Sequence, residues 1–435
     1  MLRRVALTAA LALSSVAHAD DMARIPGVEW TSILPTNTKA KTVHVAPFRL
    51  DRSPVTNEAF LAFVRSRPEW QRQRAPDALA DEGYLRKWAG PLTLGAAVDA
   101  RQPVTSVSWF AARAYCEARG ARLPTWYEWE VTAAADEHTR DARRQPGWQQ
   151  RVLNWYSRPS TGPLPRVGEQ PPNLYTVRDL HGLVWEWVED FNALMISGDS
   201  REQGDPDLLK FCGSGALSIE DRENYALAMR LALLSSLQAN ATTMNLGFRC
   251  ARSEAAADVQ PVASVRVLPP NSVYQVDAPL QKSDGRATSF ATTSARARIV
   301  TMFYATCPMA CPLTIDTLRN VDAALPAAQR AHLDVLMLTM DPERDTPAEL
   351  TRLAQERHIT DTRWTLARAS LSDTRKLAAT LGIQYRRLDT GDFDHASVLI
   401  LLDSRGRVLA RSRKLGTPDP AFLASVRKAV EEGRL

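Results

Sequence analysis

The sequence predicts a two-domain protein, in which an irregular α+β domain is followed by an α/β domain. The first half is rich in Trp and Arg and contains many short, irregular elements, whereas strands and helices alternate in the second half. Between them, residues 251–272 are rich in Ala, Val and Pro and lack helical or strand periodicity, which is typical of an interdomain connection. The predicted boundaries are 25–252 for the first domain, 253–272 for the linker and 273–435 for the second domain.

The elements of the second domain follow from its hydrophobic pattern. The apolar runs "ARIVTMFY" and "HLDVLMLTM" predict strands buried in a central sheet, and "ASVLILLDSRGRVLARS" predicts two strands joined by a turn at Ser404–Gly406. Two segments have helical spacing, with caps expected at Thr346, at Ser372-Asp373 and at Gly382. A cysteine motif follows the first core strand, and this order of elements indicates a thioredoxin-like domain.

Length and composition exclude some classes of function. A chain of 435 residues is long enough for two hydrophobic cores, and 45% hydrophobic with 24% charged residues is ordinary for a globular protein. The formal net charge of +5 is spread along the chain rather than gathered into basic blocks. The sequence therefore shows no footprint of nucleic-acid binding.

Residues 1–19 have the pattern of an export signal. Arg3 and Arg4 form a charged start, "VALTAALALSSV" is a short apolar segment, and Ala17-His18-Ala19 is a small-x-small cleavage site. The alternative is an uncleaved anchor, but the apolar run is short for spanning a bilayer. We expect a cleaved, periplasmic protein, whose paired structural cysteines form disulfides and whose functional thiols need protection or a metal.

The motif "TCPMACP" carries the main functional signal of the second domain. Cys307 is expected to end a strand, and Pro308 suits the first position of a helix. Cys307 and Cys311 are then four residues apart across a helix start, where the positive end of the helix dipole stabilises a thiolate. Two thiolates with one imidazole suit Cu(I), and a nearly identical set can hold Cu(II).

Two other interpretations of this cysteine pair stay open. In an exported protein the pair can be a plain disulfide, and a disulfide oxidoreductase usually has two rather than three intervening residues. For the third copper ligand, the histidine placed at the mouth of a strand is His395, whereas His332 and His358 lie in surface contexts.

The segments "FYATCPMACPLT", "LTMDPERDTPAEL" and "FDHASVLILLDSRG" resemble the Sco/SenC family of copper chaperones, over roughly Val276 to Lys428. The resemblance implies a thioredoxin fold and copper ligation by Cys307, Cys311 and His395. The stretch before His395 is shorter than in the family, which puts the choice of partner in question. We expect Asp341, Pro342 and Asp345 to build the turn beside the site, with Asp345 as a candidate supporting residue.

Four segments of the first domain, among them "RLPTWYEWE", "HGLVWEW" and "NLGFRCA", resemble the formylglycine-generating-enzyme/sulfatase-modifying-factor family, from about Ile25 to Arg252. The resemblance implies a compact, irregular fold with a C-type-lectin-like core. Trp126 replaces a glutamate that is common in the family, and Leu183 replaces a common asparagine.

The oxidase activity of that family is not expected in this chain. The enzyme needs two cysteines before "NLGFR", and the corresponding places here fall near Asp221 and Ala226, in a segment without cysteine. The histidines of this half, His44, His138 and His181, are scattered and do not form the three-histidine set of iron enzymes with this fold. Each is expected to be structural or exposed.

The same resemblance implies a disulfide between Cys116 and Cys250, which leaves Cys212 as an unpaired thiol, expected to be inert. It also implies a calcium site, the residues of which are Asp179 and Glu186 with the carbonyl groups of Gly182 and Val184. In the alternative, Glu186 pairs with an arginine, and Trp185 and Trp187 are core aromatics.

The segments "DLHGLVWEWVEDFN" and "FCGSGA" look most like the cysteine-poor branch of this fold found as an accessory protein of copper nitrite reductase. Together, the two resemblances predict a periplasmic copper chaperone or maturation factor. Its client would be a copper enzyme such as nitrite reductase or cytochrome oxidase, recognised by the first domain. The alternative is a thiol–disulfide oxidoreductase that reduces the copper-ligand cysteines of a client, and an oxygen-dependent modifying enzyme is the third reading.

Overall fold

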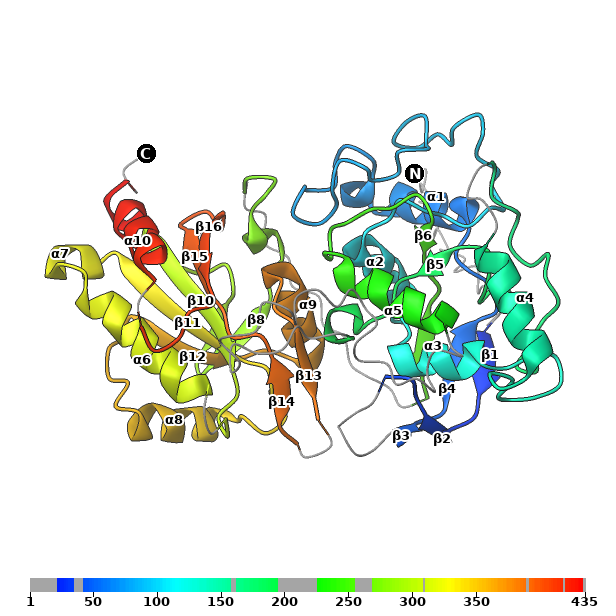
Figure 1. Ribbon diagram of the computed structural model, residues 1–435. Helices are drawn as coiled ribbons and strands as arrows, with labels where there is room; N and C mark the ends of the chain where they lie inside the picture. The colour runs from blue at the N-terminus through cyan, green and yellow to red at the C-terminus, as the bar shows by residue number, and fades with distance from the viewer. Residues whose placement is uncertain are drawn as a thin grey trace, which may run out of the picture.

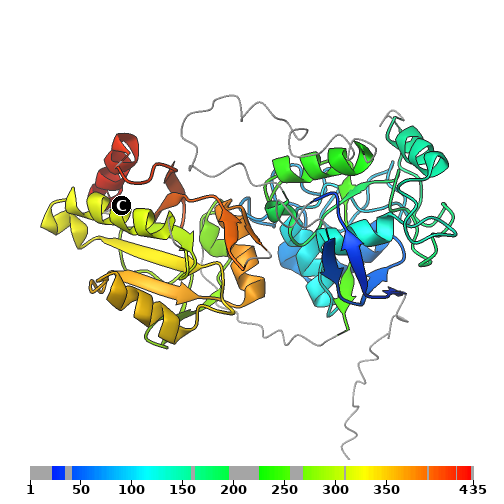
Figure 2. The same ribbon diagram turned by 60° about the horizontal axis from the view of Figure 1, so that its bottom comes forward.

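The computed structural model describes residues 22–34, 42–157, 162–194, 225–254, 268–307, 310–388, 391–417 and 419–432. The predicted export signal, Cys212 and most of the predicted linker lie outside these ranges. Two lobes lie side by side in Figures 1 and 2, one formed by each half of the chain. Among the described helices, none combines the length and the apolar character needed to cross a membrane.

The first domain is built from short elements joined by long irregular segments. In chain order they are β1 (Met22–Ile25), β2 (Val28–Thr31), β3 (Thr42–Val45), β4 (Phe48–Asp51), α1 (Asn57–Ser66), η1 (Pro68–Trp70), α2 (Trp109–Ala118), α3 (Trp126–Ala133), α4 (Pro146–Tyr156), β5 (Trp185–Glu186), η2 (Phe191–Ala193), α5 (Tyr225–Ser236), β6 (Leu246–Gly247) and β7 (Ala251–Ser253).

The strands of this domain form three small sheets, of which the largest has the antiparallel order β1-β4-β7. Tryptophans fill the core, and Trp109, Trp126, Trp129 and Trp187 are fully buried. Helix α3 begins with a capping box, in which Thr125 and Glu128 each bond the other's backbone N–H group. The core of the domain therefore rests on aromatic packing rather than on a large sheet.

The second domain contains the alternating strands and helices that its sequence predicts. Its elements are η5 (Val273–Gln275), β8 (Pro279–Lys282), β9 (Ala287–Ser289), β10 (Ala297–Phe303), α6 (Ala310–Ala323), α7 (Ala327–Arg330), β11 (Leu333–Thr339), α8 (Pro347–Glu356), β12 (Trp364–Arg368), α9 (Leu371–Leu381), β13 (Tyr385–Arg387), β14 (Phe393–His395), β15 (Leu399–Asp403), β16 (Val408–Ser412) and α10 (Pro420–Glu432).

A seven-stranded mixed sheet with the order β16-β15-β10-β11-β12-β8-β9 forms the centre of this domain. The parallel strands β10 and β11 are buried almost throughout, as expected for strands covered on both faces. Strands β13 and β14 form a separate antiparallel hairpin. The sheet therefore places the segment after β10, which carries the cysteine motif, at the same edge as the turn that follows β11.

The predicted helix caps are correct at two of three places. Thr346 caps α8, and Gly382 ends α9 in a left-handed conformation with φ of 62°, which glycine adopts without steric cost. The third cap is wrong: Ser370, not Ser372, caps α9 by accepting the N–H of Asp373 at 3.0 Å. Ser372 instead faces the first domain.

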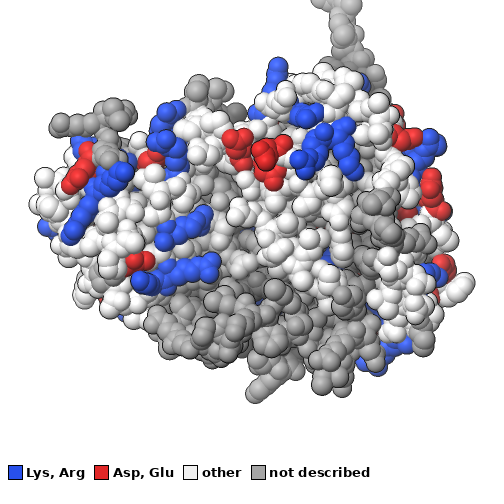
Figure 3. Space-filling view, turned by 45° about the horizontal axis from the view of Figure 1, so that its top comes forward, with Lys and Arg blue, Asp and Glu red and all other residues white. Residues whose placement is uncertain are grey.

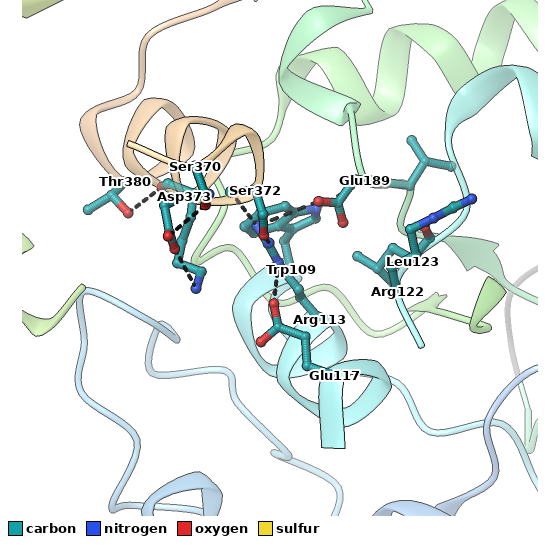
Figure 4. A network of polar contacts seen from close by, with 12 residues as sticks. Trp109, Arg113, Glu117, Arg122, Leu123, Glu189, Ser370, Ser372, Asp373 and Thr380 are labelled. Carbon is teal, nitrogen blue, oxygen red and sulfur yellow. Dashed lines mark hydrogen bonds and ion pairs between the residues drawn. The ribbon is translucent and has the colours of Figure 1, made fainter. Parts of the chain in front are cut away.

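Arg113 on α2 joins the two domains. Its guanidinium donates hydrogen bonds to the carbonyl oxygen of Ser372, at 3.3 Å, and to the Ser372 hydroxyl. Within its own domain, Arg113 pairs with Glu117 at 2.9 Å and with Glu189 at 3.5 Å, and it lies over the Trp109 ring (Figure 4). Helix α9 and strand β13 accordingly face the first domain in Figure 1.

Candidate metal centre

The two cysteines of the motif lie on either side of the start of α6. Strand β10 ends at Phe303, four residues before Cys307, so the expectation that Cys307 ends a strand is wrong. Helix α6 begins at Ala310 and carries Cys311 in its first turn. Neither thiol forms a disulfide, and both residues are buried, with 7% and 4% of their surfaces exposed.

A network of hydrogen bonds holds the two sulfur atoms close together. The backbone N–H of Cys311 points to the Cys307 Sγ at 3.4 Å, and the Cys311 thiol points to the carbonyl oxygen of Tyr304 at 3.4 Å. The Cys307 N–H donates to the same carbonyl oxygen at 3.1 Å. Tyr304 is therefore the residue around which the cysteine loop folds.

The surroundings of the Cys311 thiol favour its protonated form. The hydrogen bond to the Cys307 sulfur, together with burial, raises the pKa of the Cys311 thiol well above its ordinary value. The expected stabilisation of a thiolate by the helix start is therefore outweighed at Cys311, because two adjacent sulfur atoms do not readily carry two negative charges. A cation bound between two such sulfurs would relieve this repulsion.

His395 lies at the end of β14, where its backbone pairs with that of Tyr385 in β13. Its side chain is 2% exposed, and within the described part of the chain its Nδ1 atom has no hydrogen-bond partner. The imidazole meets the Tyr304 ring edge to face, with 5.8 Å between centroids. Tyr304 thus contacts Cys311 through its carbonyl group and His395 through its ring.

Cys311 and His395 each contact Tyr304, and Cys307 contacts Cys311, but the three predicted ligands do not form a closed site in the described structure. Among the described residues, no three His, Cys, Asp or Glu side chains come close enough together to hold a metal ion. The donor set nevertheless fits copper, because two thiols and a buried imidazole nitrogen without a partner in the described structure are the types of ligand that copper prefers. Ligation by Cys307, Cys311 and His395 stays a prediction.

The turn after β11 supports the cysteine loop. Asp345 accepts the N–H of Ala305 at 3.0 Å and the Thr339 hydroxyl, and its own N–H donates to the Asp341 carbonyl oxygen at 2.9 Å. Burial raises the pKa of Asp345. Arg344 pairs with Asp341 and also donates to the carbonyl oxygen of Gly391, which connects this turn to the β13–β14 hairpin.

The four residues of the predicted calcium site lie near one another in the chain, but the carboxylate of Glu186 is already engaged. Glu186 is fully buried and accepts two hydrogen bonds from Arg249, at 2.8 and 2.9 Å, and one from Trp129 at 2.9 Å. Asp179 accepts the Gly168 N–H at 2.5 Å. The Glu186–Arg249 pair matches the alternative hypothesis, in which Glu186 pairs with an arginine. Calcium binding stays a prediction.

The remaining predicted positions fall in different places. Cys116 and Cys250 form a disulfide with a sequence separation of 134 residues. His44 and His138 are exposed, whereas His181 is buried among Trp129, Trp148 and Trp155. Asp221 lies outside the described residues, and so does the side chain of Ala226.

Sequence reasoning missed Tyr304. It lies three residues before Cys307, and its signal was a large aromatic residue at the end of a mostly apolar strand run.

Comparisons with known proteins agree with this division of the chain. A family model described as "Sulfatase-modifying factor enzyme 1-like domain" matches residues 9–254, and the SCO1/SenC model matches residues 273–431. The chain belongs to the first family by a match over more than half its length, and it carries a SCO1/SenC domain in its second half. The two-domain recognition and the predicted fold classes are therefore confirmed.

Several curated proteins resemble the first domain. The inactive C-alpha-formylglycine-generating enzyme 2 of Bos taurus is 28% identical over 251 residues, which cover 48% of this chain and 79% of the relative. The formylglycine-generating enzyme of Streptomyces coelicolor is 28% identical over 260 residues, which cover 49% of this chain and 81% of the relative. An active and an inactive member thus match equally well.

Solved structures resemble the second domain. The Arabidopsis thaliana ScoI structure with copper bound has 17% identity and a TM-score of 0.31, and it covers 36% of this chain and 97% of that chain. The Bradyrhizobium japonicum ScoI structure with copper bound has 20% identity and a TM-score of 0.31, and the match covers 35% of this chain and 96% of that chain.

Proposed function

We propose that this chain is an exported, periplasmic copper chaperone that delivers copper to, or maintains the copper site of, an enzyme such as nitrite reductase or cytochrome oxidase. Copper is the cargo, held by Cys307, Cys311 and His395. The SCO1/SenC match supports the class of function. The first domain recognises the client, in keeping with its lack of the cysteine pair that the oxidase reaction needs.

One observation carries the proposal. The His395 Nδ1 atom is buried without a hydrogen-bond partner in the described structure, beside the tyrosine that also holds Cys311. A buried polar atom without a partner costs free energy, so such an atom in a native protein needs an explanation. A soft metal ion bound by two sulfurs and this nitrogen supplies one, because thiolate and imidazole ligands suit copper.

The test is a Cu(I) titration of the reduced, full-length chain in competition with a chromophoric chelator. The wild type should bind about one copper ion through the thiolates, and His395→Ala should weaken binding by about tenfold or more. His332→Ala, which removes a histidine of the same domain outside the cluster, should bind like the wild type. Equal affinities for wild type and His395→Ala would overturn the proposed ligand set.

A second candidate, a thiol–disulfide oxidoreductase, is favoured by the close approach of the two cysteines, in which the Cys311 N–H points to the Cys307 Sγ at 3.4 Å. In this reaction the Cys307 thiolate attacks a client disulfide, and Cys311 then displaces the second client thiol. The client gains two electrons and two protons, and the chain ends with a Cys307–Cys311 disulfide. Stoichiometric reduction of a model disulfide by the copper-free, reduced chain, lost in Cys307→Ser, would favour this candidate.

A further inference from the structure

A pocket of about 490 Å³ lies where the two domains meet. Leu34, Asp190 and Leu194 of the first domain line it, together with Arg375, Tyr385 and Phe393 of the second. We call it the interdomain pocket. Its volume is within the range of pockets that bind small ligands or short peptide segments.

The wall contributed by the second domain is the hairpin that carries His395. Phe393 is in β14, two residues before His395, and its ring lies 5.1 Å from the Tyr304 ring, centroid to centroid. Tyr385 is paired with His395 across the hairpin. A molecule in the pocket would therefore contact the element that presents the predicted copper ligand.

Polar groups of both domains line the pocket. Tyr385 is 8% exposed, and its hydroxyl group has no hydrogen-bond partner in the described structure. The Arg375 guanidinium lies near this hydroxyl and also interacts electrostatically with the carboxylates of Glu189 and Asp190. Asp190 faces the pocket from the other domain and accepts the Trp126 N–H through one oxygen, Oδ1, at 2.7 Å.

The pocket offers both hydrogen-bond donors and a hydrogen-bond acceptor, and these polar groups lie among apolar side chains. Arg375 and Tyr385 can donate hydrogen bonds, Asp190 can accept one, and Leu34, Leu194 and Phe393 offer apolar contact. A simple anion would satisfy the donors and leave Asp190 facing a like charge. A peptide segment satisfies both kinds of group, because its carbonyl groups accept and its N–H groups donate.

The walls of the pocket are held in place by contacts outside it. Arg113 bonds to Ser372 across the interface, as Figure 4 shows, and Asn192 donates to the carbonyl oxygen of Ile383 at 3.4 Å. Over the face seen in Figure 3, basic and acidic side chains are scattered, without one continuous block of either sign. The two contacts between the domains therefore hold the pocket in a preformed shape.

We propose that the interdomain pocket binds an extended, apolar segment of the client polypeptide. The carbonyl groups of that segment accept hydrogen bonds from Arg375 and Tyr385, and its N–H groups donate to Asp190. The inference rests on the proposed function and names how the client is held beside the metal ligands. Both domains contribute to this pocket, so neither half of the chain would bind the segment alone.

The test uses the reduced, copper-free full-length chain and acetyl-Leu-Gly-Leu-amide as the probe, with binding measured by calorimetry. Methylation of the internal peptide nitrogens should weaken binding about tenfold, because the donors to Asp190 are lost. Tyr385→Phe should weaken it about fivefold and Arg375→Gln about tenfold or more.

Two further variants separate a pocket effect from a folding defect. Leu371→Trp changes an exposed pocket residue and should block the probe without removing a polar group, whereas Leu409→Trp changes an equally exposed leucine on β16 and should not. Absence of binding, or equal binding by wild type, Arg375→Gln and Leu371→Trp, would overturn the proposal. So would tighter binding of benzoate than of the peptide, since this would mark a small-anion site.

Copper affinity measured on the same samples keeps the two proposals apart. If the wild type binds copper but not the probe, the pocket inference fails and the chaperone function stands. If the wild type binds the probe but His395→Ala leaves copper affinity unchanged, the peptide pocket is supported and the proposed copper site fails.

Discussion

The Tyr304 ring meets the His395 ring edge to face, with 5.8 Å between centroids, while the Tyr304 carbonyl group accepts the Cys311 thiol. One residue thus connects the cysteine loop with the hairpin of the predicted third ligand. The two contacts use different parts of Tyr304, because the first needs the ring and the second needs the backbone. They can therefore be separated by mutation.

Removing the ring should weaken copper binding without removing a ligand. We expect Tyr304→Leu to lower Cu(I) affinity about tenfold, because supporting residues commonly contribute this much to metal affinity. Tyr304→Phe keeps the ring but removes the hydroxyl that lies near Cys307, so it is the control for the ring alone and should bind copper more tightly than Tyr304→Leu. The measurement is chelator competition, and a Tyr304→Leu affinity equal to that of Tyr304→Phe would show that the ring does not position His395.

Arg113 should couple the stabilities of the two domains. Arg113→Ala removes the bonds to Ser372 and leaves the buried Glu189 carboxylate without its ion pair, a loss that typically costs about 3–5 kcal/mol. We expect urea unfolding to separate into two transitions, with the first domain unfolding earlier. Arg352→Ala, which removes an exposed arginine, serves as control. A single transition at the wild-type midpoint in Arg113→Ala would contradict this coupling.

The Cys116–Cys250 disulfide should stabilise the first domain and leave copper binding unchanged. A cross-link between residues 134 positions apart contributes about 4–5 kcal/mol in the chain-entropy model. The Cys116→Ala/Cys250→Ala variant should unfold at lower denaturant concentration and bind copper as the wild type does. Loss of copper binding in this variant would show that copper binding requires Cys116 and Cys250 as well as the cysteines of the second domain.

His181 should make the first domain sensitive to acid. Burial lowers the pKa of His181 to about 4, from 6.5 for the free side chain. Between these values the unfolded chain takes up a proton that the folded chain does not. The free energy of unfolding should therefore fall by about 3 kcal/mol as the pH drops from 6.5 to 4, and the slope due to His181 should fade as the pH rises about one to two units above 6.5.

The comparison with His181→Phe isolates this effect, because burial raises the pKa of Asp190 to about 6 and gives an opposite slope in the same range. Denaturant unfolding of both proteins at several pH values should give a difference in stability that shrinks as the pH falls. A constant difference between pH 4 and 7 would mean that His181 does not titrate as its burial requires.

Local patterns predicted the second domain well. The runs read as core strands are β10 and β11, and the two strands around Ser404–Gly406 are β15 and β16. These elements are predictable because burial of a strand leaves a pattern in the sequence. Apolar residues either alternate with polar ones or form a continuous run. The Ser372 cap was wrong because a serine near a helix start can either cap the helix backbone or contact a neighbouring domain. Ser372 does the second, and its partner Arg113 is 259 residues away in the sequence.

The sequence proposes a set of ligands for the candidate site, which stays a prediction, but it does not predict the geometry around them. Cys307, Cys311 and His395 were found through their motifs, whereas the role of Tyr304 depends on a ring contact between segments far apart in the chain. The interdomain pocket could not be read from either half, since it exists only where Asp190 and Arg375 face each other across the interface.

The most direct test of the central claim is X-ray absorption at the copper edge of the copper-loaded, full-length chain. The account predicts a first shell of two sulfur atoms from Cys307 and Cys311 and one nitrogen from His395, with the nitrogen lost in His395→Ala and kept in His332→Ala. A shell without nitrogen, or one that His395→Ala leaves unchanged, would contradict the claim that His395 completes the copper site.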